Sequence, residues 1–420
     1  AFICYNNLMR DIKSLKSLIE VQLAQPFEKI SVITLVDLFV EYAYSTKASD
    51  IHIEPTTEMS RIRFRIDGIL QDVSDKLKIT KELHQEIISR IKVLSGLRTD
   101  EHFLPQDGRF KVRVEELGDV DIRVSVMPTY YGENSILRVL AETHGFTLES
   151  LGFLPNDQKR VEEAIKKPYG MILANGPTGS GKTTTLYTIL KKLNDPEVSI
   201  ITIEDPIEYS LSGTTQIQIN DQAGLTFANG LRSILRQDPN IIMVGEIRDE
   251  DTAGIAVNAA LTGHLVLSTL HTNDAATTFP RLLDMGIPPF LVASTVNVAI
   301  GQRLVRTLCP KCKMKRVLTP KEVASLGEMI PEISKIGSRE FFMGKGCAAC
   351  GQSGYQGRMS INEVIEVNDE IRQLIMNRAN ATQIKEAAIR SGMTTMMLAG
   401  VERALKGLTS IEEVVRIIHE

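Results

Sequence analysis

The sequence has no run of roughly 18 consecutive apolar residues, the length that a helix needs to cross a bilayer. Its first five residues, Ala1-Phe2-Ile3-Cys4-Tyr5, lack the basic region and apolar stretch of a secretory signal. They also lack an initiating methionine, so we expect a fragment or a processed product. No fixed-period repeat or low-complexity tract is present. These absences favour a cytoplasmic protein that does not span a membrane.

The chain also has little excess of one charge over the other and few cysteines. The formal net charge is −4, which argues against a dominant nucleic-acid surface. Only five of the 420 residues are cysteine, and in a chain without a secretory signal clustered cysteines bind metal more often than they form disulfides. The length predicts two to four domains.

The most informative stretch is Gly176–Thr183, which reads G-x-x-x-x-G-K-T, the phosphate-binding P-loop. A short apolar run precedes it and a helical pattern follows it, and this strand–loop–helix context gives the motif its mechanism. Backbone N–H groups and the helix N-terminus attract phosphate, Lys182 reaches the β- and γ-phosphates, and the Thr183 hydroxyl binds Mg²⁺. The predicted nucleotide-binding residues are Gly176, Pro177, Thr178, Gly179, Ser180, Gly181, Lys182, Thr183 and Thr184.

Changes of pattern along the chain predict an α/β protein with several domains. Residues 30–142 combine two helical segments with alternating polar and apolar strands, which indicates a compact α+β domain. After residue 148, helices alternate with β-branched runs, which is typical of a parallel sheet covered on both faces. The predicted divisions are a lead-in or remnant of an N-terminal module (1–29), the α+β domain (30–142), a linker (143–147), a nucleotide-binding core (148–300), a cysteine-bearing subdomain (301–360) and a C-terminal helical subdomain (361–420).

The apolar run Ile241–Val244 delivers Glu246 close to its carboxyl end, where α/β sheets bind ligands. This is the Walker B position, at which Asp is usual. Because Glu is one methylene longer, we expect Glu246 to act through a water in the Mg²⁺ shell. The alternative is an acid that caps the following helix.

Two histidines, His264 and His271, stand at the two ends of another apolar run. A histidine beside a strand is usually structural, but in an NTPase sheet a histidine at a strand end is a hypothesis for sensing the γ-phosphate. We predict His264 for this role. The pair does not suit a metal site, because seven strand positions span about 20 Å.

The charge of a phosphoryl transition state is commonly stabilised by an arginine. Arg123 and Arg138, on consecutive strands of the first domain, are the first candidates, although exposed sheet positions are the commoner fate of such residues. The alternative set, in the second domain and facing a neighbouring subunit, is Arg232, Arg236, Arg248 and Arg281.

Four cysteines form a C-x₂-C, x₃₄, C-x₂-C set, namely Cys309, Cys312, Cys347 and Cys350. Two paired knuckles indicate a structural Zn²⁺ site, although the spacer is longer than in common zinc ribbons. Four thiolates leave no open position on the metal, so the expected role is to fold this segment. The alternative is four reduced thiols.

Taken in order, these motifs resemble the secretion ATPase superfamily of type II secretion and type IV pilus assembly. The matching segments are 49–54, the P-loop, the acidic box 202–209, the segment 244–249 and the histidine box 261–272. Because the retraction-type members lack the tetracysteine insert, the resemblance is to the assembly or secretion type.

The resemblance implies a PAS-like N-terminal domain, a RecA-like P-loop ATPase core at 148–300 and a zinc subdomain at 301–360, with residues 1–29 as the remnant of a docking domain. It also implies ATP and Mg²⁺ at the P-loop, and a homo-hexamer that binds inner-membrane platform and stator proteins. It implies that Arg123 and Arg138 swing onto the phosphates, and that Arg358 belongs to the nucleotide site. It also favours Glu208, and after it Glu204, as the carboxylate that orients the attacking water. The implied location is cytoplasmic and peripheral at the inner membrane.

Two other functions stay open at this point. One is a RecA-like nucleic-acid motor with the zinc segment as a DNA-binding ribbon. Its basic residues are Arg303, Arg306, Lys311, Lys313, Lys315 and Arg316, but no aromatic platform lies among them, so no nucleic acid is expected. The other is an assembly scaffold that binds ATP without hydrolysing it.

Overall fold

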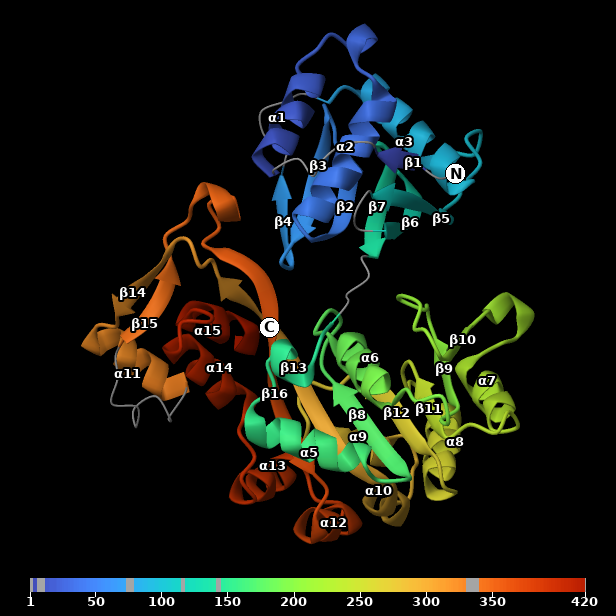
Figure 1. The fold of residues 1–420 in the computed structure, drawn as a ribbon, viewed down its shortest axis with the longest axis vertical. Coiled ribbons are helices and arrows are strands. Elements are labelled where there is room, and N and C mark those ends of the chain that lie inside the picture. Colours follow the sequence, from blue (N-terminus) through green and yellow to red (C-terminus); the bar gives the residue numbers. More distant parts are fainter. Residues whose placement is uncertain are drawn as a thin grey trace. The chain divides into compact units, whose positions relative to one another are not determined.

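The computed structural model describes residues 3–5, 12–72, 79–114, 118–140, 145–329 and 340–419. The chain divides into two compact units, Ala1–His144 and Gly145–Glu420 (Figure 1). Parts of the predicted lead-in and linker, residues 1–2, 6–11, 143 and 144, lie outside the described residues. The two units are described separately below.

The first unit is built on a sheet whose described strands run in the order β1-β5-β6-β7-β2-β3-β4, with β1 parallel to β5 and the other neighbours antiparallel. The alternating polar and apolar residues found in the sequence form these strands, so each strand has one apolar face. The strands are β1 (Ile3–Tyr5), β2 (Ala48–Pro55), β3 (Ser60–Ile66), β4 (Ile69–Asp72), β5 (Gln106–Val114), β6 (Gly118–Thr129) and β7 (Gly132–Leu140).

Three helices, α1 (Ile12–Leu23), α2 (Val32–Ser45) and α3 (Lys81–Ser95), pack on the apolar face of this sheet. Helix α1 is part of this core, since Leu15 and Ile19 are fully buried against it. The structure therefore places the helix of the predicted lead-in inside the N-terminal unit, and the predicted boundary at residue 30 falls between α1 and α2. The sequence could not show this, because the apolar residues of α1 gain a partner only when α2 lies beside them.

The second unit contains a sheet whose described strands run in the order β10-β9-β11-β12-β8-β13-β16. All neighbours are parallel except β13 and β16. The β-branched runs predict strands at 171–175, 199–203, 216–219, 241–244 and 265–269, and all five are confirmed with each end within one residue of the observed strand. The strands are β8 (Gly170–Asn175), β9 (Ile200–Glu204), β10 (Thr215–Gln218), β11 (Ile241–Val244), β12 (Leu265–Leu270), β13 (Val296–Leu308) and β16 (Tyr355–Glu366).

Helices cover both faces of this sheet, because alternate strand residues enter two separate cores. One core contains α5 (Pro155–Ile165) and α6 (Lys182–Leu193); the other contains α7 (Phe227–Ile234), α8 (Glu250–Leu261), α9 (Thr278–Asp284), α10 (Pro289–Thr295), α12 (Asp369–Met376) and α13 (Ala381–Arg390). Together with the first unit, this architecture confirms the predicted α/β fold class, with an α+β domain before a P-loop ATPase domain. The short helix α4 (Leu148–Leu151) precedes α5.

The cysteine segment is an insertion between β13 and β16, two strands that pair with each other in the main sheet. It holds the two-stranded sheet of β14 (Lys313–Val317) and β15 (Glu340–Gly344) and the helix α11 (Pro320–Met329). Helices α14 (Met396–Leu405) and α15 (Ile411–His419) pack beside it. The predicted boundaries at 300 and 360 therefore fall within β13 and β16. Among the described helices, none is long and apolar enough to cross a membrane.

Candidate ATP site

The P-loop connects β8 to α6 at the carboxyl edge of the second sheet. Every residue of β8 is buried, and the loop from Gly176 to Gly181 ends where Lys182 begins α6. Gly176 has a φ of +144°, and a Cβ there would lie 2.4 Å from the carbonyl oxygen of Gln302, so only glycine fits this position. The loop and helix N-terminus thus have the geometry that binds phosphate through backbone N–H groups.

Lys182 lies against the loop that it serves. Its Nζ donates hydrogen bonds to the carbonyl oxygens of Gly176, at 2.8 Å, and Pro177, at 3.0 Å. Burial lowers the pKa of Lys182, and the nearby Glu246 carboxylate acts in the opposite direction. The ammonium group is therefore held within the loop, where a phosphate would compete for its protons. The hydroxyl-bearing residues Thr183 and Thr184 follow it and are half-buried.

Glu246 lies at the carboxyl end of β11, where the Walker B interpretation requires it. Its Oε2 is 2.8 Å from Nε2 of His271, and its Oε1 forms an ion pair with Arg248. Its charge is close enough to influence Lys182, on the helix after the P-loop. The structure thus brings Glu246, His271 and Lys182 to one edge of the sheet.

His264, predicted to sense the γ-phosphate, does not lie at the P-loop edge of the sheet. His264 precedes β12, and its Nδ1 lies 3.0 Å from the carbonyl oxygen of Ala259. Because β12 is parallel to β8, with Leu265 opposite Gly170, His264 lies at the amino edge of the sheet, about 20 Å along the strand from the P-loop edge. His271 follows the carboxyl end of β12 and is the histidine beside Glu246. The signal was in the sequence, since ligands bind at carboxyl ends of parallel strands.

The two carboxylates of the acidic box differ in their surroundings. Glu204 is buried and accepts hydrogen bonds from Thr202 Oγ1 at 2.6 Å, Gln216 Nε2 at 3.1 Å and the Tyr187 hydroxyl. Burial, together with the Glu204 charge, raises the pKa of Tyr187, so this hydroxyl keeps its proton. Glu204 therefore joins α6, β9 and β10. Glu208, which is half-buried, stays the first prediction for the water-orienting carboxylate.

Tyr187 and Gln216 were not predicted as part of the site. They reach Glu204 from α6 and β10, the elements directly before and after β9, and Gln216 Nε2 also lies 3.2 Å from the Tyr187 hydroxyl. A tyrosine on the apolar face of a helix is normally predicted to be a core residue. The sequence therefore gives no sign that Tyr187 contacts Glu204.

In the first unit, Arg123 and Arg138 lie in a row of charged residues that crosses the sheet. The strand register places Arg109 opposite Arg123, Arg123 opposite Arg138, Arg138 opposite Asp50 and Asp50 opposite Arg65. These side chains alternate with core residues and so lie on the face away from the helices. Asp50 is 2.9 Å from Arg138 and 3.5 Å from Arg65. Adjacent arginines repel one another, so this face is suited to an anion.

The remaining predicted arginines lie elsewhere. Arg358 is exposed on β16 and pairs in register with Arg306, five positions beyond the residue opposite Asn175, which is about 16 Å along the strand from the start of the P-loop. In the alternative set, Arg232 forms an ion pair with Asp251 at 3.0 Å, and Arg248 pairs with Glu246.

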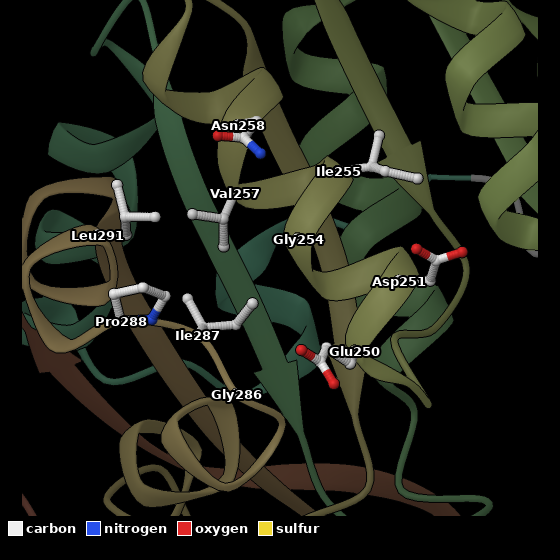
Figure 2. A pocket seen from close by; sticks show the side chains of 10 residues that line it. All are labelled: Glu250, Asp251, Gly254, Ile255, Val257, Asn258, Gly286, Ile287, Pro288 and Leu291. Carbon is white, nitrogen blue, oxygen red and sulfur yellow. The ribbon is translucent and has the colours of Figure 1, made fainter.

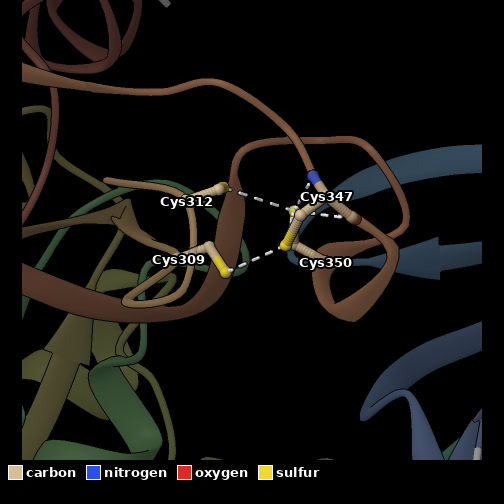
Figure 3. Close-up of side chains that lie close together, drawn as sticks. All are labelled: Cys309, Cys312, Cys347 and Cys350. Atoms are coloured by element: carbon tan, nitrogen blue, oxygen red, sulfur yellow. Dashed lines mark hydrogen bonds between the residues drawn. The ribbon is translucent and has the colours of Figure 1, made fainter. Parts of the chain in front are cut away.

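The four predicted metal ligands come together (Figure 3). The sulfur atoms are 3.9 Å apart for Cys309 and Cys347, 3.8 Å for Cys312 and Cys350, and 3.7 Å for Cys347 and Cys350. Tetrahedral zinc with bonds of about 2.3 Å requires sulfur atoms about 3.8 Å apart. The four thiols therefore fit a zinc ion.

Backbone groups also prepare one of these sulfurs to bind a cation. The N–H groups of Cys347 and Gly354 donate to Cys350 Sγ, each at 3.3 Å. Although burial acts to raise it, these donors lower the pKa of the Cys350 thiol to about 7. A thiol that ionises near neutral pH is a ready metal ligand.

A separate pocket of about 550 Å³ lies between α8 and the segment that leads into α10 (Figure 2). Apolar and acidic or amide side chains share its wall. It is lined by Glu250, Asp251, Gly254, Ile255, Val257, Asn258, Gly286, Ile287, Pro288 and Leu291. Among the described residues, none of those predicted for ATP chemistry lines this pocket, so it is not the nucleotide site.

Comparison with known proteins gives a consistent picture. Residues 27–416 match the family described as type II/IV secretion system protein. The chain is 45% identical over 395 residues to the type IV pilus assembly ATPase PilB of Myxococcus xanthus, covering 94% of this chain and 69% of that protein. It is 44% identical over 391 residues to type II secretion system protein E of Aeromonas hydrophila, covering 93% and 76%.

A solved structure is similar over nearly the same span. The pilus retraction motor PilT, in a crystal structure with bound ADP, is 26% identical, with a TM-score of 0.60 and coverage of 90% of this chain and 95% of that one.

Proposed function

Since this chain belongs to the type II/IV secretion system protein family and is an ATPase of that family, we propose that it is a hexameric motor that powers assembly of a type II secretion pseudopilus or a type IV pilus. ATP hydrolysis in the second unit would be converted into movement of the first unit. The observation that carries the proposal is the convergence of Lys182, Glu246 and His271 at the P-loop edge of one sheet.

Each residue at this edge has a role in the proposed reaction. Lys182 binds the β- and γ-phosphates, and Thr183 binds Mg²⁺ with Glu246 holding a water in the metal's shell. Glu208 orients the attacking water. His271, hydrogen-bonded to Glu246 at 2.8 Å, is placed to register the presence of the γ-phosphate. Arg123 and Arg138 supply positive charge to the transition state when the two units close. Arg358, about 16 Å along the strand from the start of the P-loop, is kept as a nucleotide-site residue on the family resemblance alone.

The tetracysteine cluster would hold Zn²⁺ as a structural ion. Four thiolates complete its coordination, so the metal would stabilise the segment between β13 and β16 rather than take part in hydrolysis. The sulfur separations near 3.8 Å support this assignment.

The partners would be further copies of this chain in a hexamer and inner-membrane platform and stator proteins. One relative is named for pilus assembly and the other for type II secretion, and the chain is 45% and 44% identical to them. The proposal therefore includes both kinds of machine. The protein would act in the cytoplasm, at the inner face of the membrane through these partners.

The alternative of a DNA motor loses support because three of its six basic residues form ion pairs within the protein. Arg306 forms an ion pair with Glu413 at 2.6 Å, Lys315 pairs with Glu340 at 3.0 Å, and Arg316 pairs with Glu322 and Glu412. Charges neutralised within the protein contribute little to phosphate binding. DNA stimulation of the ATPase would restore this alternative, whereas stimulation by membrane partners with acidic lipid supports secretion.

The Lys182→Ala variant tests the proposal. Removal of this phosphate ligand should reduce the ATPase rate of the full chain by about 100-fold or more, while circular dichroism and the melting temperature stay near those of the wild type. Single-turnover phosphate release is the measurement. A wild-type chain that binds ATP and releases no phosphate would support the scaffold alternative, and an active variant would contradict the proposed site.

A further inference from the structure

A buried amide from β13 lies against the P-loop. The register of β13 with β8 places Gly301 opposite Asn175, the last residue of β8, so Gln302 follows beside the loop. Gln302 is only 1% exposed. A buried amide requires hydrogen-bond partners, and those of Gln302 all belong to the P-loop and its helix.

Both ends of the carboxamide are used. Nε2 of Gln302 donates to the carbonyl oxygen of Ser180 at 2.9 Å, and Oε1 accepts from the Thr185 hydroxyl at 2.8 Å. Ser180 lies in the loop and Thr185 in the first turn of α6. The Gln302 side chain therefore connects the P-loop to the first turn of α6, the helix that follows the loop.

Two glycines of the motif are close to the same residue. A Cβ on Gly176 would lie 2.4 Å from the Gln302 carbonyl oxygen, and one on Gly181, where φ is +87°, would lie 2.9 Å from Nε2. The Gly176 contact is with the backbone of β13, which cannot move aside, whereas the Gly181 contact is with the end of the Gln302 side chain. Strand β13 therefore packs closely against the P-loop at both glycines.

The bond to Ser180 fixes the orientation of a peptide plane. In a trans peptide the C=O and the following N–H point in opposite directions. Because the Ser180 carbonyl is directed at Gln302, the N–H of Gly181 is directed away from β13. This is one of the N–H groups with which a P-loop binds phosphate.

We propose that Gln302 is a positioning residue for ATP: it holds the Ser180–Gly181 peptide in the orientation that presents the Gly181 N–H to the phosphates. The inference rests on the proposed ATPase function and adds a residue outside the P-loop motif. Gln302 acts through the loop and does not touch the reacting atoms.

An amide is needed because it donates to one partner and accepts from the other. Gln302→Glu keeps the shape and the acceptor for Thr185 but sets a carboxylate against the Ser180 carbonyl, with negative charge beside the phosphate site. Gln302→Ala removes both bonds. Both variants are expected to weaken ATP binding, and Gln302→Glu more strongly.

The test compares Gln302→Ala and Gln302→Glu with Asn362→Ala in the full chain. Asn362 is a matched control, since it is a buried amide on β16 in register with Gln302, and its Nδ2 bonds Ser360 rather than the P-loop. We expect the Kd of a fluorescent ATP analogue and the KM to rise at least tenfold in both Gln302 variants. Asn362→Ala should keep the wild-type Kd whatever its melting temperature.

If Gln302→Ala binds the analogue with wild-type affinity and only its melting temperature falls, the role is structural and the proposal fails. Thr185→Val, which removes only the hydroxyl that donates to Gln302, keeps the test open should the first variants not fold. It should raise the KM by a smaller factor, and an unchanged KM counts against the proposal. A wild-type chain without hydrolysis would instead overturn the proposed function.

Discussion

Glu246 connects the charged groups at the phosphate edge of the second unit. It pairs with Arg248, lies 2.8 Å from His271, and influences the pKa of Lys182. One carboxylate therefore contacts both Arg248 and His271 and lies close enough to Lys182 to favour its charged form.

Substitution of His271 and of His264 distinguishes a role in catalysis from a role in structure alone. His271→Ala should lower kcat by about 100-fold, because it removes a hydrogen-bond partner of Glu246 at the site of charge development. His264→Ala, at the opposite edge of the sheet, should leave kcat within about twofold. Steady-state phosphate release measures both. Equal losses in the two variants would contradict the assignment of His271.

The acidic box allows a similar comparison. Glu208→Gln should keep ATP bound and abolish hydrolysis, because the attacking water is no longer oriented. Glu204→Gln should chiefly lower the melting temperature, since the bonds from Thr202, Gln216 and Tyr187 lose a charged acceptor, each worth about 1.5–3 kcal/mol. Nucleotide binding, phosphate release and thermal melting distinguish them. Rapid turnover in Glu208→Gln would move the water-orienting role elsewhere.

At the scale of elements, the strands show what could be predicted. Strands β8, β9, β11 and β12 are short apolar runs between polar turns, and their length and composition, rather than a period, predict them. β13 and β16 were not predicted, because their pairing joins residues separated by the whole cysteine segment. Strand pairing over such a distance is a property of the folded chain. Because Gln302 lies on β13, its contact with the P-loop could not be predicted from the sequence either.

The prediction at the scale of elements concerns the zinc content of the cysteine segment and its resistance to protease. The protein should contain about one zinc ion per chain, and removal of the ion by a strong chelator should make residues 309–354 sensitive to protease, because metal binding supplies about 10–16 kcal/mol to such sites. Elemental analysis and limited proteolysis are the measurements. Cys312→Ser should lose zinc, whereas Cys4→Ser, at the fifth cysteine, should retain it. Full zinc content in Cys312→Ser would contradict the ligand set.

At the scale of the whole molecule, the two units carry complementary chemistry. The second unit has the phosphate-binding loop, and the first has a sheet face on which Arg109, Arg123 and Arg138 are neighbours. Asp50 holds Arg138 at 2.9 Å, which keeps one guanidinium in place on that face. Under the proposed function, a nucleotide bound by the second unit would be the anion for this surface.

Closure of the two units is the prediction that follows. Dyes introduced at Lys16 and Ser294 through unnatural amino acids, which leave the zinc thiols untouched, should show a change in energy transfer when a slowly hydrolysed ATP analogue binds. Arg138→Ala should bind the analogue but hydrolyse ATP about 10³-fold more slowly. Lys182→Ala serves as the control without a nucleotide response. Identical transfer with and without nucleotide in the wild type would rule out the coupling.

The pairing of Leu308 with Tyr355 brings the two ends of the cysteine segment together. A stretch whose ends are neighbours can be exchanged as one cassette, with a tight turn joining the strands in its absence. The cysteine segment also packs on the rest of the second unit, however, because Phe341 of β15 is buried against Val401 of α14 and Val414 of α15. Removal of the cysteine segment would therefore expose Val401 and Val414 to water, so the segment and these two helices form one packing unit.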